Sequence, residues 1–131
     1  MALTGQENFS LPICIGAIAA DGNTTCTPLF QSPSTHQLNI KSIKIAASAA
    51  GATDSTNYQD VAIKTIGGTC LAWYSNNGTG GSALVAGEFI DMTLIVRTIP
   101  SSTDVYVDYT MAGTGTAFTG VCIQIDAEAI V

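Results

Sequence analysis

Hydrophobic and polar residues alternate with a period of two in several short segments of this chain. The pattern covers residues 90–96, 104–110 and 121–129. In the last segment, one face would carry Val121, Ile123, Ile125, Ala127 and Ala129, and the other Cys122, Gln124, Asp126 and Glu128. Because successive side chains of a strand point to opposite faces, the alternation predicts half-buried antiparallel strands.

Clusters of turn-forming residues divide the rest of the chain into pieces of strand length. We predict about eight strands, at residues 11–19, 27–31, 37–48, 58–66, 69–75, 83–97, 103–111 and 117–129. Helical periodicity is hard to find. The Ala-rich stretch 45–52 lacks an N-cap residue and runs into Gly51, so we interpret it as a strand end followed by a loop.

The alternation slips by one residue in the third predicted strand. Leu38 and Ile40 share one parity, whereas Ile43 and Ile45 share the other. A slip of this kind is what a β-bulge produces, because the extra residue shifts the side chains after it to the opposite face. We therefore predict a bulge near Ser42.

Eight short strands separated by polar turns predict an all-β domain, built as an antiparallel β-sandwich with a jelly-roll-like topology. An immunoglobulin-like topology is the competing arrangement. The polar first ten residues predict an extended N-terminal arm, so we divide the chain into an arm at residues 1–10 and a single β-sandwich domain at residues 11–131.

The composition shows that charge is scarce and acidic. The chain has 131 residues, of which 47% are hydrophobic and 11% charged, and its formal net charge is −6. Because typical soluble domains carry about 25% charged residues, uncharged surface must lie exposed or be covered by partners. The four Lys and Arg residues cannot form the basic stripe that binds phosphate backbones, so we expect no nucleic-acid partner.

The charges are also unevenly distributed. All four bases lie within residues 41–97, whereas residues 98–131 contain only acids, namely Asp104, Asp108, Asp126 and Glu128. This division would help subunits to meet in one orientation, although a solvated acidic face gives the same pattern. The longest charge-free run, 65–87, contains Gly67, Gly68 and the turn-forming run 76–81. It is therefore not a transmembrane helix, and we expect no membrane partner.

Residues for catalysis are few. His36 is the single histidine, and no G-x-S-x-G turn marks a nucleophilic serine near it. Asp126 and Glu128 lie two apart on one strand face, as paired glycosidase carboxylates do, but any solvent-facing strand gives this spacing. We predict that the chain is not an enzyme and has no catalytic residues.

Sites for metals and cofactors are equally sparse. The oxygen-rich segments 21–24 and 54–60 do not follow the spacing of an EF-hand, so we interpret them as turns. The Gly113-Thr114-Gly115 run lacks the strand-to-helix context of a phosphate-binding loop. We predict no metal site and no cofactor.

Four cysteines, Cys14, Cys26, Cys70 and Cys122, contain no C-x-x-C pair. They allow three disulfide connectivities, and a Cys14–Cys26 bridge would close a short loop. Cys14 and Cys70 lie in apolar surroundings, where free cysteine packs as a small hydrophobic residue. We favour four free thiols, with the disulfide state left open.

The composition and strand pattern of the whole chain resemble those of the small head decoration proteins, or capsid cement proteins, of tailed bacteriophages. The likeness lies in the start MALTG, the weakly charged strands, the segment SSTDVYVDYTMAGTG and the end GVCIQIDAEAIV. The resemblance implies a jelly-roll or related β-sandwich that forms a homotrimer. It also implies a place on the outer surface of the virion capsid, where the protein stabilises the head by bridging neighbouring major capsid protein subunits. It supplies no catalytic or ligand residues.

The composition favours the same function, because a weakly charged domain risks aggregation unless subunit contacts cover its surface. Two alternatives remain open. One is a phage tail-fibre or another virion component, and the other is a secreted carbohydrate-binding or pilus-type sandwich. Sugar binding would require an exposed aromatic platform. Trp73-Tyr74 is the only adjacent aromatic pair, and strand geometry lets only one of the two point inward.

Overall fold

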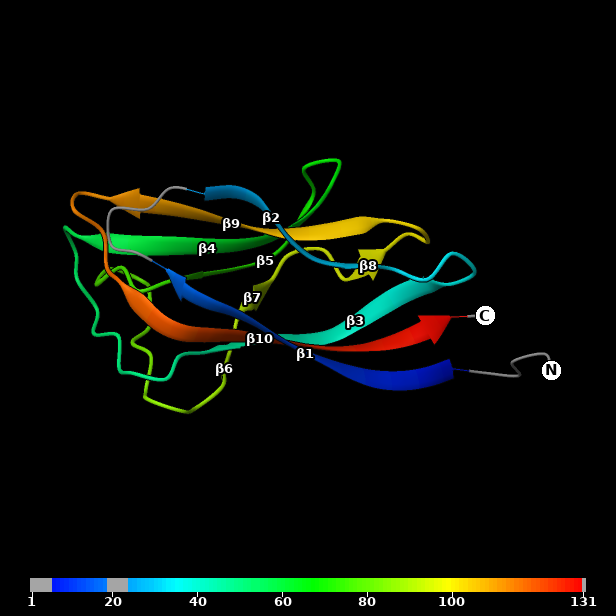
Figure 1. Cartoon of the computed structure of the whole chain (residues 1–131), viewed down its shortest axis with the longest axis horizontal. Coiled ribbons are helices and arrows are strands. Elements are labelled where there is room, and N and C mark those ends of the chain that lie inside the picture. The colour runs from blue at the N-terminus through cyan, green and yellow to red at the C-terminus, as the bar shows by residue number, and fades with distance from the viewer. Residues whose placement is uncertain (1–5, 19–23, 131) are drawn as a thin grey trace.

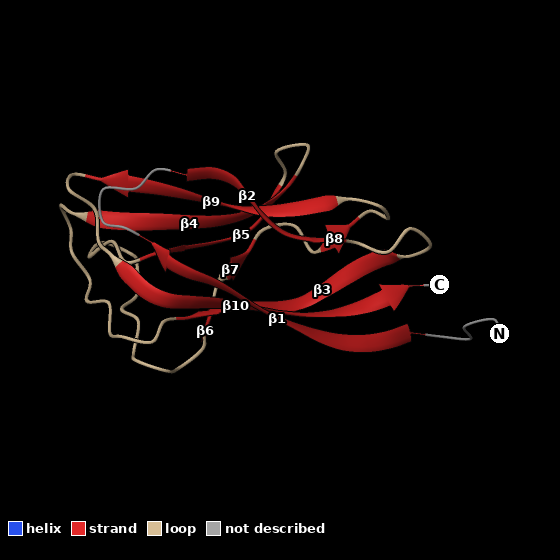
Figure 2. Cartoon of the chain, in the orientation of Figure 1, coloured by secondary structure: helices blue, strands red, loops and turns tan. Residues whose placement is uncertain are grey.

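The computed structural model describes residues 6–18 and 24–130, and the regular elements of this part are all β-strands (Figure 2). The ten strands are β1 (Gln6–Ile18), β2 (Thr24–Gln31), β3 (Gln37–Ala46), β4 (Tyr58–Thr65), β5 (Cys70–Ser75), β6 (Ile90–Asp91), β7 (Thr93–Leu94), β8 (Thr98–Ile99), β9 (Asp104–Ala112) and β10 (Phe118–Ile130). The described part contains no helix long and apolar enough to cross a membrane. The predicted all-β class is confirmed.

The strands form two five-stranded sheets that face each other as two layers (Figure 1). Sheet A has the order β1-β10-β3-β6, with β8 also paired to β3, and sheet B has the order β2-β9-β4-β5-β7. Every pairing between these strands is antiparallel. The molecule is therefore a β-sandwich, as predicted.

The strand order is that of a jelly roll. If β6, β7 and β8 are taken as one interrupted strand, the chain has eight strands. The first, eighth, third and sixth then form sheet A, and the second, seventh, fourth and fifth form the main part of sheet B. In an immunoglobulin-like sandwich the first strand would pair with the second, whereas here β1 pairs with β10. The jelly-roll topology is confirmed over its competitor.

One predicted strand is wrong. Residues 83–97 were expected to form a single strand, but they contain only the two-residue strands β6 and β7, and β8 follows them. The segment passes from one sheet to the other. The N–H of Met92 donates to Ile43 O in sheet A at 2.8 Å, and the N–H of Ile95 donates to Leu71 O beside sheet B at 2.8 Å. No single strand can form both sets of bonds.

The N-terminal strand begins earlier than expected. β1 starts at Gln6 and not at residue 11, and Gln6 to Ser10 pair with Ile130 to Asp126 of β10. The second half of the predicted arm at residues 1–10 is therefore part of sheet A. Residues 1–5 of that arm lie outside the described residues.

The predicted bulge is present in β3. Asp126 of β10 pairs with Ser42 and the next residue, Ala127, pairs with Ile40, so Lys41 is the extra residue. The bulge allows Ile40 and Ile43, which are three residues apart, both to be buried. Without it, one of the two would face solvent.

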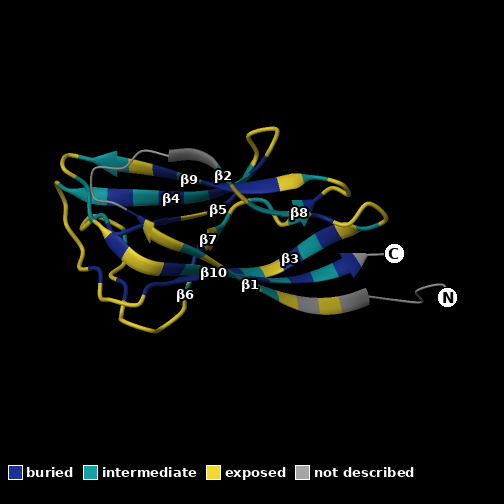
Figure 3. Cartoon of the chain, in the orientation of Figure 1, coloured by how far each residue is buried: buried dark blue, intermediate teal, exposed yellow. Residues whose placement is uncertain are grey.

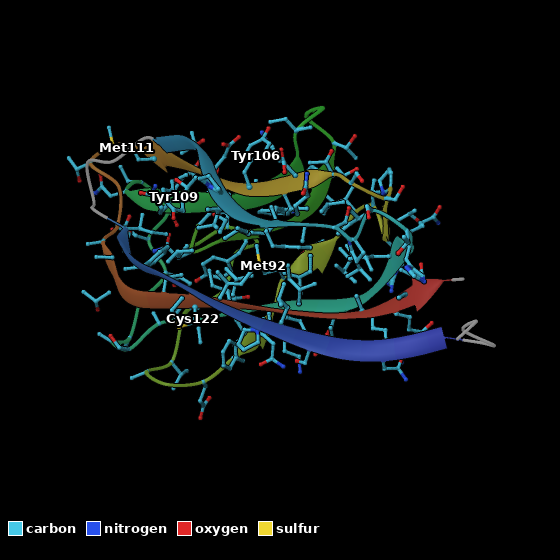
Figure 4. All side chains as sticks on the ribbon, turned by 45° about the vertical axis from the view of Figure 1, so that its right-hand side comes forward. Met92, Tyr106, Tyr109, Met111 and Cys122 are labelled. Carbon is cyan, nitrogen blue, oxygen red and sulfur yellow. A yellow bond between two sulfur atoms is a disulfide. The ribbon has the colours of Figure 1, made fainter. Side chains whose placement is uncertain are left out.

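The core lies between the sheets, where buried positions alternate with partly exposed ones along the long strands (Figure 3). The largest fully buried side chains are Phe118, Leu38, Ile40, Ile43, Ile45, Ile63, Leu71, Leu84, Ile99, Ile123, Ile125 and Gln59. Met92, from the segment that passes between the sheets, is also buried and lies between the two layers (Figure 4). The inward residues predicted for the last strand, Val121 to Ala129, are all buried.

A disulfide joins Cys14 to Cys122, so the prediction of four free thiols is wrong for this pair. The two residues are 108 positions apart in the sequence but are directly paired on β1 and β10, with 4.0 Å between their Cα atoms. Cys70 is a free thiol. The side chain of Cys26 is not among those that the structure describes. The spacing of the cysteines in the sequence does not predict this disulfide, because it depends on the register between two strands that are distant in the chain.

On one side of the sandwich, the edge strand of each sheet contains a proline. β1 and β2 are edge strands, and Pro12 and Pro28 lie within them. The short Cα–Cα distance at Cys14 and Cys122 indicates a pair without mutual backbone hydrogen bonds. Pro12 lies two residues before Cys14, so its backbone nitrogen also points away from β10 and toward the free edge. Because proline has no N–H, it offers no donor there. A proline in this position opposes strand addition by another chain.

We expect the variant Cys14→Ser to lose about 2–4 kcal/mol of unfolding free energy, because the bridge closes a loop of 108 residues in the unfolded chain. Urea unfolding followed by circular dichroism measures this loss. A reductant should destabilise the wild-type chain by a similar amount and leave Cys14→Ser unchanged. Cys70→Ser is the matched control and should stay close to the wild type. Equal stability of Cys14→Ser and the wild type without reductant would contradict the bridge.

Candidate functional site

Five large hydrophobic side chains are exposed in the described part of the chain. They are Ile66 (64% exposed), Ile95 (55%), Val85 (50%), Phe89 (43%) and Trp73 (38%). All but Trp73 lie outside the regular strands, in the hairpin turn after β4, the loop before β6 and the link between β7 and β8. Single exposed apolar residues are normal on a surface, so only those with apolar surroundings point to a contact.

Ile66, the most exposed of the five, lies in the tight turn of the β4–β5 hairpin. The N–H of Thr65 donates to Thr69 O at 2.9 Å, and the N–H of Gly68 donates back to Thr65 O at 2.8 Å. Gly68 has φ of +89°, which favours glycine at this position. The N–H of Ile66 also donates to Asp104 O at 2.9 Å, which ties the turn to β9. The hairpin projects beyond sheet B in Figure 1.

Two surface hollows lie on either side of Ile66. The first, which we call the β2–β9 hollow, has a volume of about 400 Å³ and is lined by Pro28, Leu29, Phe30, Gln31, Ile66, Asp104, Val105 and Tyr106. The second, the β8 hollow, has a volume of about 450 Å³ and is lined by Thr65, Ile66, Gly67, Thr69, Val96, Thr98, Pro100 and Thr103. Ile66 thus stands between two concave surfaces, one of which contains a carboxylate.

One ion pair of the described residues lies on the outer face of sheet B. Lys64 Nζ lies 3.0 Å from Asp108 Oδ2, and the hydrogen bond to Asp108 raises the pKa of Lys64. Cys70, the register partner of Lys64 on β5, has its pKa raised by burial. A thiol with a raised pKa is a poor nucleophile at neutral pH, so Cys70 does not have the properties of a reactive cysteine.

Asp126 and Glu128, the two carboxylates on the outer face of β10, have separate partners. Ser10 Oγ donates to Asp126 Oδ1 at 2.5 Å and Ser42 Oγ donates to Oδ2 at 3.0 Å. The hydrogen bond from Ser10 is the main cause that lowers the pKa of Asp126 below its ordinary value. Hydrogen bonds from Ser42 and Gln124 lower it further. Glu128 forms an ion pair of 2.8 Å with Lys41 Nζ. The two carboxylates link β10 to β1 and β3. The hydrogen bonds from the serines keep Asp126 charged at neutral pH.

His36 is hydrogen-bonded to the neighbouring side chain. Its Nδ1 lies 2.5 Å from Thr35 Oγ1. Histidine acts as a general base when a carboxylate or carbonyl orients one ring nitrogen and the other faces a nucleophile. The contact with Thr35 alone does not form such an arrangement.

The segments weighed as metal or phosphate sites form turns where they are described. Asp54 Oδ1 accepts the N–H groups of Thr56 and Asn57, both at 2.8 Å, and these bonds lower the pKa of Asp54. The N–H of Thr114 donates to Asn57 Oδ1 at 2.9 Å. Most of segment 21–24 lies outside the described residues. Within the described part, no three His, Cys, Asp or Glu side chains gather as a metal site would require.

A polar junction at one end of the sandwich was missed by the sequence reasoning, which assigned Asn76 to a surface turn. Asn76 is fully buried. Its Oδ1 accepts the N–H of Gln59 at 2.8 Å, and its Nδ2 donates to Ala52 O at 2.8 Å and Thr116 Oγ1 at 3.0 Å. The side chain therefore joins four segments, and its function is structural. Asn76 begins the run Asn76-Asn77-Gly78, which is typical of a turn, and no signal in the sequence marks Asn76 as buried.

The two adjacent aromatic residues point to opposite faces, as predicted. Tyr74 is buried, its hydroxyl donates to Ser82 O at 2.5 Å, and its ring centroid lies 6.0 Å from that of Phe118. Burial raises the pKa of Tyr74 to about 12. Trp73 lies on the outer face of sheet B, beside a hollow of about 40 Å³.

Comparisons with known proteins found no matching family model and no matching curated protein. Two solved structures of infectious bursal disease virus are similar in backbone. The Gt strain structure has a TM-score of 0.41 and 12% identity over 91% of this chain and 32% of that chain. The Gx strain structure has a TM-score of 0.38 and 12% identity over 95% of this chain and 36% of that chain. The present chain thus spans about a third of each viral chain.

The raised pKa of Tyr74 predicts a loss of stability in alkaline solution. Unfolded tyrosine ionises near pH 10.0 and the folded residue near 12, so its contribution is complete below pH 10 and is lost as pH rises toward 12. We expect the unfolding free energy of the wild type to fall by about 1 kcal/mol more than that of Tyr74→Phe between pH 8 and pH 11. Urea unfolding at both pH values tests this. Parallel losses in the two proteins would contradict it.

Proposed function

We propose that this chain is a structural virion protein, namely a capsid decoration or cement protein. It binds the outer surface of a bacteriophage head and stabilises it by bridging neighbouring major capsid protein subunits. The observation that carries the proposal is the exposed Ile66 between two hollows, on a surface where charge is scarce. The sequence resemblance to phage head decoration proteins supports the same function.

The energetics suit a protein that acts by covering surface. Burying an exposed large aliphatic side chain contributes about 1.5–3 kcal/mol. One such contact is weak, but a closed oligomer that presents several copies to a repeating lattice binds tightly through avidity. The jelly roll supplies a rigid support for this purpose, since its two sheets enclose a continuous core and the disulfide ties the first strand to the last.

The proposal includes a homotrimer that works without chemical turnover, cofactor or nucleic acid. The described carboxylates of β10 are engaged with neighbouring strands, and the ring of His36 is hydrogen-bonded to the hydroxyl of Thr35. These arrangements support a function that depends on contact and not on a reaction.

The test combines a solution mass with the location of the chain on particles. Sedimentation equilibrium should give three times the chain mass of 13.4 kDa. Gold-labelled chain should decorate phage heads evenly in electron micrographs. Ile66→Ser should weaken co-sedimentation with heads by about 10-fold, since a buried isoleucine is lost from each contact. Thr69→Ser in the same hairpin is the matched control and should bind normally.

Two outcomes would overturn the proposal. A protein that is monomeric at micromolar concentration and does not co-sediment with heads has no decoration function. Label confined to the tail would instead identify a tail component, which is the nearest alternative function.

The disulfide favours one second candidate, a secreted carbohydrate-binding or pilus-type sandwich, because such bridges persist in oxidising compartments. If this candidate were correct, a glycan in a screened panel would quench the fluorescence of Trp73, the single tryptophan. On the decoration proposal we expect no quenching by any glycan. Saturable quenching that Trp73→Phe abolishes at unchanged fold would favour the binding module instead.

A further inference from the structure

Two surface patches each combine an exposed isoleucine with an exposed charge. One patch is the link between β7 and β8, where Ile95 and Arg97 are both exposed. The other is the β2–β9 hollow, where Ile66 and Asp104 lie together and the backbone of Ile66 bonds to that of Asp104. The first patch carries a positive charge and the second a negative one.

These two charges have no ion-pair partner within the described part of the chain, which is also true of Asp60, Glu88 and Asp91. Lys41 and Lys64 form ion pairs with Glu128 and Asp108. Lys44 lies close enough to Asp126 to lower its pKa. Arg97 has no carboxylate within ion-pair distance among the described residues, and the same part of the structure shows no ion pair or side-chain hydrogen bond for Asp104.

The two patches are separate surfaces, since the hollow that Arg97 lines and the β2–β9 hollow share no lining residue. In sheet B, β2 is at one edge and β7 at the other. The β2–β9 hollow includes residues of β2, whereas the Ile95–Arg97 link follows β7 directly and continues to sheet A, where the N–H of Ile40 donates to Arg97 O at 2.6 Å. Arg97 and Asp104 form no ion pair among the described residues of one copy, whereas a second copy can bring the two charges together.

The edge strands direct association to these patches. Pro12 in β1 and Pro28 in β2 oppose the addition of a neighbouring strand to either sheet on that side. The outer face of sheet A is covered by the paired groups of Asp126 and Glu128, which are already satisfied within the chain. We therefore consider a contact between copies that uses exposed apolar side chains and one complementary charge pair.

We propose that copies of this chain associate head to tail, with Ile95 and Arg97 of one copy seated in the β2–β9 hollow of the next. In this contact Arg97 pairs with Asp104, and Ile95 packs against Ile66 and the apolar wall formed by Pro28 and Phe30. The inference rests on the proposed function, since it names the contact through which the oligomer forms. Because the two surfaces differ, the interface is heterologous, and a rotation that closes gives a ring.

The contact predicts a charge-reversal pattern in self-association. Arg97→Glu places two acids together in the contact and Asp104→Arg places two bases together, so each should weaken self-association by about 10-fold or more. The double variant Arg97→Glu/Asp104→Arg reverses both charges and should restore association to within about 3-fold of the wild type. Sedimentation equilibrium in 50 mM salt measures all three, and circular dichroism melting checks that each variant folds.

Two control variants change the net charge by the same amounts at other exposed or partly exposed positions. Lys44→Glu matches Arg97→Glu, and Glu88→Arg matches Asp104→Arg. Both should associate as the wild type does. If they weaken association equally, general charge repulsion explains the result and the specific contact is wrong.

The possible failures of this inference and of the proposed function are distinct. If the wild type is oligomeric and binds heads but neither single reversal changes its mass, the oligomer forms through another surface and only this inference is overturned. A wild type that is monomeric yet decorates heads also overturns only this inference. In that case the β2–β9 hollow would bind a capsid partner and not a second copy. A wild type that neither associates nor binds heads overturns both.

Discussion

The pairing of β10 with β1 on one side and β3 on the other is the interaction on which the rest of the structure depends. β10 has 13 residues, and its inward side chains form a large part of the buried face of sheet A. Its outward side chains attach the neighbours, through Cys122 to β1, Asp126 to both and Glu128 to β3. A slip of one residue in either pairing would exchange the two faces and break all of these links.

Several of the few charged side chains join neighbouring strands on the outer faces of the sandwich. Asp126, Glu128 and Lys64 each contact an adjacent strand, and the turn of the β4–β5 hairpin carries no charge. Apolar side chains such as Ile66 are left exposed beside concave surface. A domain of this kind is suited to recognition by contact, and most of its exposed large apolar side chains lie in the hairpin turn and the loops.

Much of the fold was predictable because period-two alternation is a local property. It identified the long strands, and the change of parity around Ser42 identified the bulge. The segment 83–97 was not predictable, because its alternation is typical of a strand while its hydrogen bonds are divided between two sheets. The site was less predictable still. Scarce charge indicated a covered surface, but nothing local placed Ile66 beside Asp104 or buried Asn76.

The sequence by itself determined the all-β class, the position of most long strands, the inward residues of the last strand and the small number of candidate catalytic groups. Each of these follows from side-chain type and from the two-residue repeat of an extended backbone. The tertiary structure alone decided that Cys14 faces Cys122 and that Arg97 and Asp104 line separate hollows. The physical reason is that strand register and strand order are set by burial of one common core, and this burial joins residues that are distant in the chain.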